Sequence, residues 1–101
     1  MLECERYKYL KALEQQKVIS NLRRQVKYVL LPSQKDSKTQ KTIEREITYL
    51  ADFVYEKGSQ TIVEDAKGVK TDVYKIKRKL MLYFHNIRIK EVTKETRTWA
   101  V

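Results

Sequence analysis

Apolar side chains recur at helical spacing near the start of this chain, and that pattern predicts a helix. No glycine or proline interrupts residues 2–31. We predict one long helix over residues 1–31, ended by Pro32, because a proline disfavours helical geometry in the residue before it. Its narrow apolar seam would pack inside the monomer or against a second copy in a dimer. The seam consists of Ile19, Leu22, Val26 and Val29.

A second periodic segment follows a polar linker over residues 32–38. The pattern predicts a helix that begins near residue 39 and runs to about Lys57, with Gly58 as its stop. The residues expected on its buried face are Ile43, Ile47, Leu50 and Val54.

The third periodic segment predicts two helices separated by a tight turn. A short helix would run from Ile62 to Lys67, and a longer basic helix from about Thr71 to His85, with Gly68 in the turn between them. The longer helix carries an apolar stripe that needs a core to bury it. This stripe consists of Val73, Ile76, Leu80, Phe84 and Ile87.

A basic helix preceded closely by a short apolar helix is typical of a helix-turn-helix. With Val73 at the fifteenth position of the motif's twenty-residue pattern, Ile62, Val63, Ala66 and Ile76 also occupy apolar or small positions. The glycine of the turn comes one place late. The pattern therefore predicts a second helix, starting near Thr71, that binds the major groove of DNA.

These segments together predict an all-α protein with a single domain over residues 1–101. Only two glycines and one proline occur, which favours helices over turns. We expect residues 39–87 to hold one helix and the helix-turn-helix, and residues 88–101 to form a short strand or an unfixed tail.

Positive charge is concentrated in the predicted basic helix. The formal net charge is +9, and residues 67–90 carry eight Lys or Arg against one acid, Asp72. Such clustering indicates a polyanionic partner, and double-stranded DNA fits better than a membrane. The side chains expected to contact phosphates or base edges are Lys70, Thr71, Tyr74, Lys75, Lys77, Arg78 and Lys79. For Tyr74, packing inside the protein is an equal alternative.

The segment from Val73 to Leu80 resembles the recognition helix of sigma-factor region 4 and of phage late-gene transcription regulators of the RinA/ArpU type. The run Ile76-Lys77-Arg78-Lys79 carries much of this resemblance. The resemblance implies a regulator, encoded by a phage or mobile element, that binds a promoter and touches RNA polymerase.

The residues suggest no catalytic or metal site. One histidine, His85, and one cysteine, Cys4, cannot build a zinc site eighty positions apart. Glu64 and Asp65 are adjacent, and adjacent side chains on a helix point apart, so we interpret them as favourable charge in a helix's first turn. We expect a binding protein, without enzyme activity or cofactor.

Two functions remain open from the sequence. The first is a sequence-specific DNA-binding transcriptional regulator, and the alternative is a small helical protein that binds a host protein such as RNA polymerase or a nuclease. No apolar run approaches the roughly 18 residues of a membrane span, so we expect a cytoplasmic protein. We expect Tyr49, Tyr55 and Tyr83 to pack in the core.

Overall fold

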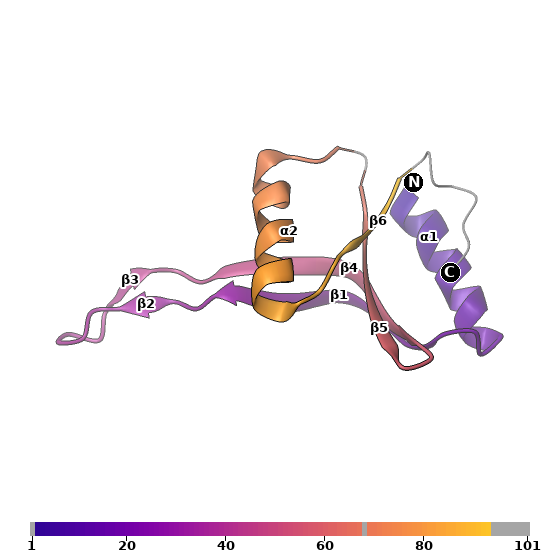
Figure 1. The fold of residues 1–101 in the computed structure, drawn as a ribbon, viewed down its shortest axis with the longest axis horizontal. Helices are drawn as coiled ribbons and strands as arrows, with labels where there is room; N and C mark the ends of the chain where they lie inside the picture. Colours follow the sequence, from indigo (N-terminus) through magenta and orange to yellow (C-terminus); the bar gives the residue numbers. More distant parts are fainter. Residues whose placement is uncertain (1, 68, 94–101) are drawn as a thin grey trace.

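The computed structural model describes residues 2–67 and 69–93 and shows an α/β protein, so the all-α prediction is wrong. Two helices flank a mixed sheet (Figure 1). In chain order the elements are α1 (Leu2–Gln15), β1 (Ser20–Leu31), β2 (Gln34–Lys35), β3 (Thr42–Glu44), β4 (Ile47–Lys57), β5 (Gln60–Ala66), α2 (Asp72–His85) and β6 (Lys90–Val92).

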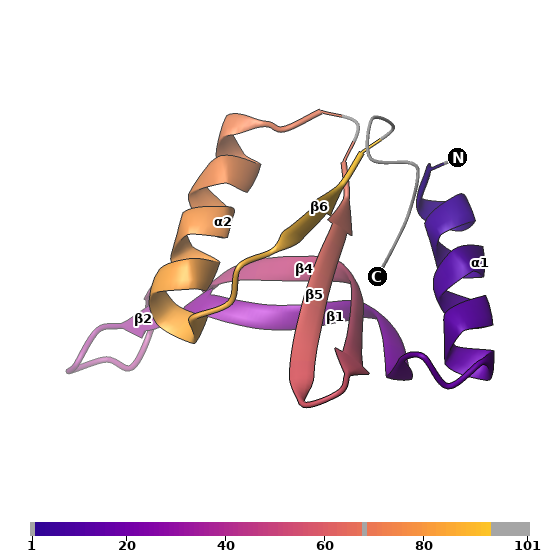
Figure 2. The same cartoon turned by 45° about the vertical axis from the view of Figure 1, so that its right-hand side comes forward.

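The main sheet has four strands in the order β1-β4-β5-β6. Strand β4 pairs antiparallel with β1 on one side and with β5 on the other, whereas β5 and β6 run parallel. Parallel neighbours need a crossover connection, and α2 supplies it. Strands β5 and β6 rise from the long β1–β4 ribbon, with one helix on either side of them (Figure 2).

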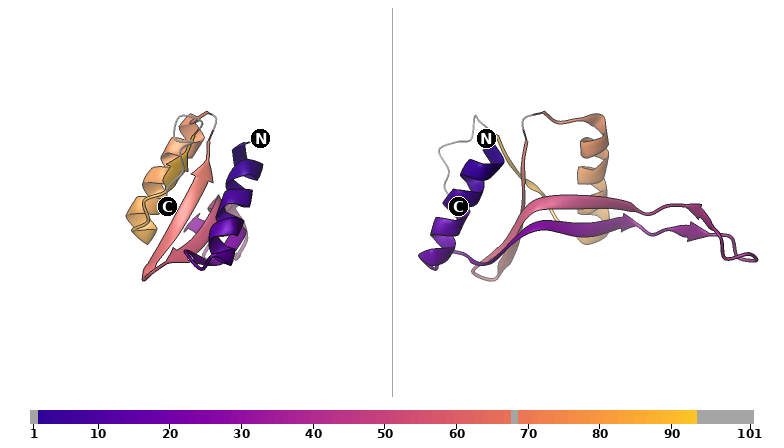
Figure 3. Two further views of the ribbon diagram at one scale, coloured as in Figure 1. Left: turned by 90° about the vertical axis from the view of Figure 1, so that its right-hand side faces the viewer. Right: turned by 180° about the vertical axis from the view of Figure 1, so that it is seen from behind.

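The two helices cover opposite faces of the sheet, as the end-on view in Figure 3 shows. On the α1 face, Leu10 packs with Phe53 and Tyr55 of β4. On the α2 face, Tyr74 and Met81 pack in a cluster with strand residues. Those strand residues are Leu30, Tyr49, Ala51, Val54 and Val63.

The predicted helix over residues 1–31 stops halfway, because its second half is strand β1. Lys17, between the helix and the strand, adopts a left-handed conformation with φ 64°. Beyond it Val26, Tyr28 and Leu30 fall on alternate residues of β1 and pack in or against the cluster under α2. Period-two alternation is the property of a strand with one buried face, whereas we had assigned Val26 to a helical seam with Ile19, Leu22 and Val29.

The helices predicted from residue 39 to Lys57 and from Ile62 to Lys67 are both strands, β4 and β5. They form a hairpin through Gly58, whose φ of 61° suits a tight turn. Without a helix before it, α2 cannot be the second half of a helix-turn-helix, and that prediction is wrong. Gly68, expected in the turn of the motif, lies outside the described residues.

Helix α2 begins and ends where the sequence predicted. Thr71 caps its first turn by accepting from the backbone N–H of Tyr74 at 3.1 Å, and Asn86 ends it with φ 54°. The buried face that we predicted for α2 was wrong, however. Tyr74 and Met81 are buried, while most of the predicted stripe is exposed.

Beyond the sheet the β1–β4 ribbon continues into a protruding arm formed by β2, β3 and the loop between them (Figure 1). Every residue from 32 to 47 is exposed except Asp36, which is half-buried. The segment predicted as a linker is therefore the outgoing half of this arm. Neither described helix is long and apolar enough to cross a membrane, and Trp99 lies outside the described residues.

Candidate active site

A cleft of about 430 Å³ opens on the α2 face, where β4 and β5 meet the start of α2. We call it the carboxylate cleft. The residues lining it are Glu3, Tyr49, Leu50, Asp52, Asp65, Ala66, Lys67, Thr71, Val73, Tyr74 and Lys77.

Two carboxylates reach this cleft from neighbouring strands. The β4–β5 ladder ends at the pair Phe53 and Glu64, and one further step would bring Asp52 opposite Asp65. Like charges directly opposite each other are unfavourable. Instead of continuing the ladder, Asp52 accepts a hydrogen bond from the backbone N–H of Ala66 at 2.9 Å through Oδ2.

The strand β4 changes face at Asp52. Ala51 belongs to the cluster under α2 and Phe53 to the cluster under α1, although residues two apart on a regular strand share a face. On β1, the neighbouring Gln25 is left-handed, with φ 54°. The irregularity in both strands brings the half-buried Asp52 into the cleft.

Asp65 is buried, with only 3% of its surface exposed. The Tyr49 hydroxyl donates to its Oδ2 at 2.5 Å, and the Lys67 ammonium lies 3.3 Å from its Oδ1. Burial raises the pKa of Asp65 to about 6, and repulsion from Asp52 adds to that effect against the lowering influence of Tyr49 and Lys67. The carboxylate is therefore costly to ionise and has a strong affinity for positive charge.

Lys67 extends the site from the end of β5. Its ammonium lies 3.3 Å from Asp65 and 4.3 Å from the centroid of the Tyr74 ring, and its backbone N–H donates to the carbonyl of Val92 at 2.9 Å. A cation held over an aromatic ring keeps its position at modest cost. The side chain is still 27% exposed, so a ligand in the cleft can reach it.

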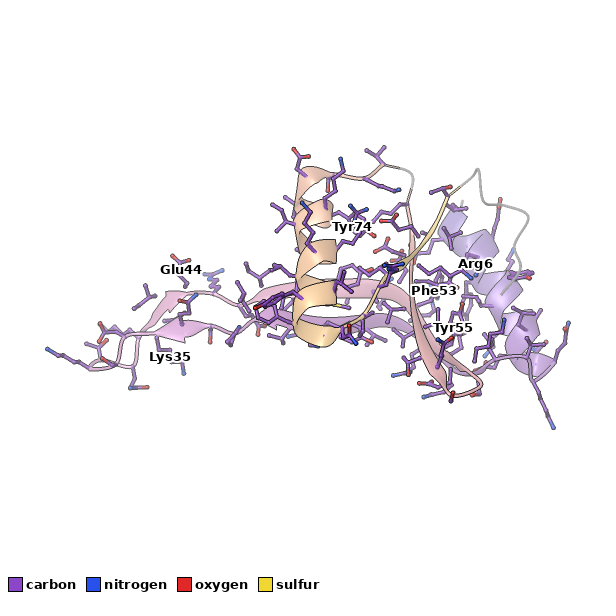
Figure 4. All side chains as sticks on the ribbon, viewed as in Figure 1. Arg6, Lys35, Glu44, Phe53, Tyr55 and Tyr74 are labelled. Atoms are coloured by element: carbon purple, nitrogen blue, oxygen red, sulfur yellow. The ribbon has the colours of Figure 1, made fainter. Side chains whose placement is uncertain are left out.

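Behind the site, on the α1 face, Glu64 forms a second charged cluster. Arg6 reaches it from α1 (Figure 4) and donates through Nε at 2.8 Å and Nη2 at 2.6 Å, and the Tyr55 hydroxyl donates to Oε2. Adjacent strand residues point to opposite faces, so Glu64 anchors α1 while Asp65 faces α2. Glu64 and Asp65 do point apart, as we expected of adjacent acids, but they lie on strand β5, so neither is in the first turn of a helix.

Four of the residues predicted to contact DNA are occupied by contacts within the protein. Glu91 of β6 accepts from Tyr74 at 2.7 Å and pairs with Lys70 and Arg78, each at 3.0 Å. Burial alone would raise the pKa of Glu91, but these three donors outweigh it and lower the pKa to about 2. Tyr74, Lys70 and Arg78 therefore fix α2 and the residues before it against β6. Thr71 caps the first turn of α2.

The remaining predicted residues separate around α2. Lys77 lines the carboxylate cleft. Lys79 lines a different cavity, of about 300 Å³, together with Arg78 and Leu82, and Lys75 is exposed. Of the cations on α2 that we expected to contact DNA, Lys77 therefore lines the carboxylate cleft, whereas Arg78 and Lys79 line the other cavity.

The predicted dimerisation residues form no helical seam. Ile19 is buried beside Leu10, Leu22 and Val26 are half-buried against the two cores, and Val29 is exposed on β1. Self-association through them stays a prediction. Of the tyrosines expected in the core, Tyr49 and Tyr55 are buried and Tyr83 is exposed.

The cleft could hold a cation through few protein ligands. Among the described residues no group of three or more His, Cys, Asp or Glu side chains could hold a metal ion. The third acid of the cleft, Glu3, accepts from Gln25 at 3.2 Å. Asp52 and Asp65 alone suit Mg²⁺, which commonly takes one or two carboxylates and completes its shell with water and substrate phosphate.

Sequence reasoning missed Asp52, Asp65 and Lys67. A single carboxylate inside the apolar run of residues 47–55, followed by an Asp-Ala-Lys sequence at the end of the next run, could have indicated them. Placing them together requires the hairpin through Gly58, which the helical interpretation excluded.

No curated protein and no solved structure matches the chain. The resemblance of α2 to sigma-factor region 4 and the RinA/ArpU regulators stays an expectation, because no match bears on it. A family model described as "Protein of unknown function (DUF1064)" matches residues 1–99, and the chain therefore belongs to that family.

Proposed function

We propose that the protein is a divalent-cation-dependent hydrolase of nucleic-acid phosphodiester bonds. The observation that carries this proposal is the meeting of Asp52, Asp65 and Lys67 in one cleft, from two adjacent strands. It replaces our expectation of a binding protein without enzyme activity.

The carboxylates are the proposed cation ligands. A bound Mg²⁺ would supply charge stabilisation and orient the substrate phosphate. Ionised Asp65 is costly in the folded protein, because burial and Asp52 raise its pKa to about 6. A cation between the two carboxylates would relieve that cost, which supports the assignment.

Lys67 is the proposed stabiliser of the reacting phosphate. When the oxygen of a water attacks phosphorus, the bond to the leaving sugar oxygen breaks, and the proton lost by the water is balanced by one gained on that oxygen. Negative charge grows on the phosphoryl oxygens during this step. An ammonium fixed by Asp65 and the Tyr74 ring is suited to stabilise it without reorganising.

The overall charge supports nucleic acid as the phosphodiester. A protein of net charge +9 attracts a polyanion over long range, although the cleft itself contains acids. The cleft also includes Lys77, a second cation beside Lys67. This proposal keeps the predicted nucleic-acid partner but not recognition through a helix-turn-helix.

The test is cleavage of labelled DNA and RNA in Mg²⁺, with EDTA as the negative control. Asp52→Asn, Asp65→Asn and Lys67→Met should each lower the rate by at least about 100-fold, whereas Asp72→Asn, on the exposed first turn of α2, should cleave as the parent does. Cleavage that survives EDTA, or that Asp65→Asn leaves unchanged, would contradict the proposal. So would a parent that cleaves neither polymer.

A further inference from the structure

One flank of α2 is apolar and borders the carboxylate cleft. Residues at spacings of three, four and four share a side of a helix, and on α2 they form an apolar row that we call the apolar flank. It consists of Val73, Ile76, Leu80 and Phe84. Leu80 is half-buried against the core, and the other three side chains are exposed. Val73 also lines the cleft and is 62% exposed, and Ile76 is 57% exposed.

The opposite flank of α2 has a different character. Arg78, Lys79 and Leu82 line the separate cavity beside β6, and Arg78 is paired with Glu91. The apolar flank therefore meets the cleft at Val73, and most of the helix's positive charge lies on the far side.

A single cation interrupts the apolar flank. Lys77 lies between Ile76 and Leu80 along the helix, lines the cleft with Val73, and has no carboxylate within salt-bridge distance among the described residues. The wall beside Asp52 and Asp65 thus combines apolar side chains with one unpaired ammonium. Across the cleft, Leu50 of β4 adds a further apolar side chain, 51% exposed.

We infer that this wall binds single-stranded nucleic acid, with unstacked bases against Val73 and Ile76 and a backbone phosphate against Lys77. The inference rests on the proposed function. A duplex presents phosphates and sugars outward and keeps its base faces stacked inside, so it offers little to an apolar wall. A single strand exposes base faces and phosphates together, which matches apolar and cationic side chains along one surface.

A second copy of the chain fits this surface less well. Docking an apolar surface of a second copy on the apolar flank would bury Lys77 without a partner, and an unpaired buried ammonium is strongly unfavourable. It would also cover the mouth of the cleft. The unpaired cation favours an anionic, partly apolar occupant.

The test measures binding without cleavage. Fluorescence anisotropy in EDTA compares a labelled single strand of about 20 nucleotides with a duplex of the same length. We expect the parent to bind the single strand at least about tenfold more tightly than the duplex. The double variant Val73→Thr, Ile76→Gln should lower this ratio of single-strand to duplex affinity by roughly fivefold or more. Lys77→Gln should weaken binding of the single strand and flatten its dependence on salt by about 0.7 in the logarithmic slope.

The matched control is Leu82→Gln, which removes an apolar side chain of 48% exposure from the other flank. It should leave the ratio unchanged. The inference would be overturned if the parent bound the single strand and the duplex equally. It would also be overturned if the Val73→Thr, Ile76→Gln variant, shown by circular dichroism to be folded, kept the parent's preference for the single strand. Both results would count even if Mg²⁺-dependent cleavage is found. A parent that sediments as a dimer, and becomes a monomer in that variant, would overturn it in favour of a second copy. Conversely, selective single-strand binding without cleavage would sustain this surface and reject only the hydrolase.

Discussion

Replacing Asp65 with asparagine should stabilise the protein at neutral pH while removing its proposed activity. The pKa of Asp65 is raised from 3.8 to about 6, so the folded protein holds that proton more tightly than the unfolded chain does. The contribution of this group is fully favourable below about pH 4 and is lost as the pH rises through about 6. A shift of about 2 units corresponds to a cost of about 3 kcal/mol at neutral pH.

Asparagine carries no charge to desolvate. The raised pKa of Asp65 already includes the attraction of Lys67 and the hydrogen bond from Tyr49, so the loss of those contacts needs no separate correction. We therefore expect Asp65→Asn to be more stable than the parent by about 3 kcal/mol at about pH 7, a rise in melting temperature on the order of 15 °C for a chain of this length.

Urea unfolding of both proteins at about pH 7 and about pH 4 measures this difference, which should nearly vanish at the lower pH because the parent's carboxyl is then protonated. Asp72→Asn is the control, since Asp72 is exposed on the first turn of α2 and should change stability by no more than about 1 kcal/mol. An Asp65→Asn protein that is no more stable than the parent near pH 7, or whose advantage persists near pH 4, would refute the reasoning.

Three further outcomes follow from the framework around the cleft. Arg6→Met should destabilise the fold by about 3 kcal/mol in urea unfolding, because it leaves Glu64 charged and buried. Adding Glu64→Gln to that variant should recover part of the loss. A stability of Arg6→Met within about 1 kcal/mol of the parent would contradict this. Because the pKa of Glu91 is lowered to about 2, the parent should lose stability as the pH falls from about 4.5 to about 2, and Glu91→Gln should lose less over that range. If the free energy of unfolding fell equally with pH in both proteins, this would be contradicted. Limited trypsin digestion should cut first at Lys38 or Lys41 in the exposed arm, and a first cut elsewhere would show that the arm is protected.

The sequence predicted α2 because its evidence is local. Thr71 caps the first turn, Asn86 adopts the left-handed conformation that ends the last one, and both lie within a few residues of the backbone groups they satisfy. Its buried face could not be read in the same way. Tyr74 and Met81 are buried because β1 and the β4–β5 hairpin lie there, and that depends on the topology.

The strands were missed because short apolar runs fit both periods. Ile43, Ile47, Leu50 and Val54 match a helical face, yet only Val54 among them is buried. The other buried residues of this segment are Tyr49, Ala51, Phe53 and Tyr55. The β-branched and aromatic content of β1 and β4 favours strands, and it should have outweighed the scarcity of glycine and proline. With β4 and β5 taken as helices, Asp52 and Asp65 could not be placed in one cleft.

The hairpin that carries the two carboxylates also has consequences for the order of folding. Asp52 and Asp65 lie 13 positions apart on one hairpin. The Arg6–Glu64 contact that anchors α1 closes 58 residues. Closing the longer loop costs about 1 kcal/mol more in chain entropy. We expect the β4–β5 hairpin to form early and α1 to dock late, so that substitutions at Val54 slow folding and substitutions at Leu10 mainly speed unfolding. Stopped-flow folding and unfolding rates would distinguish this order from its reverse.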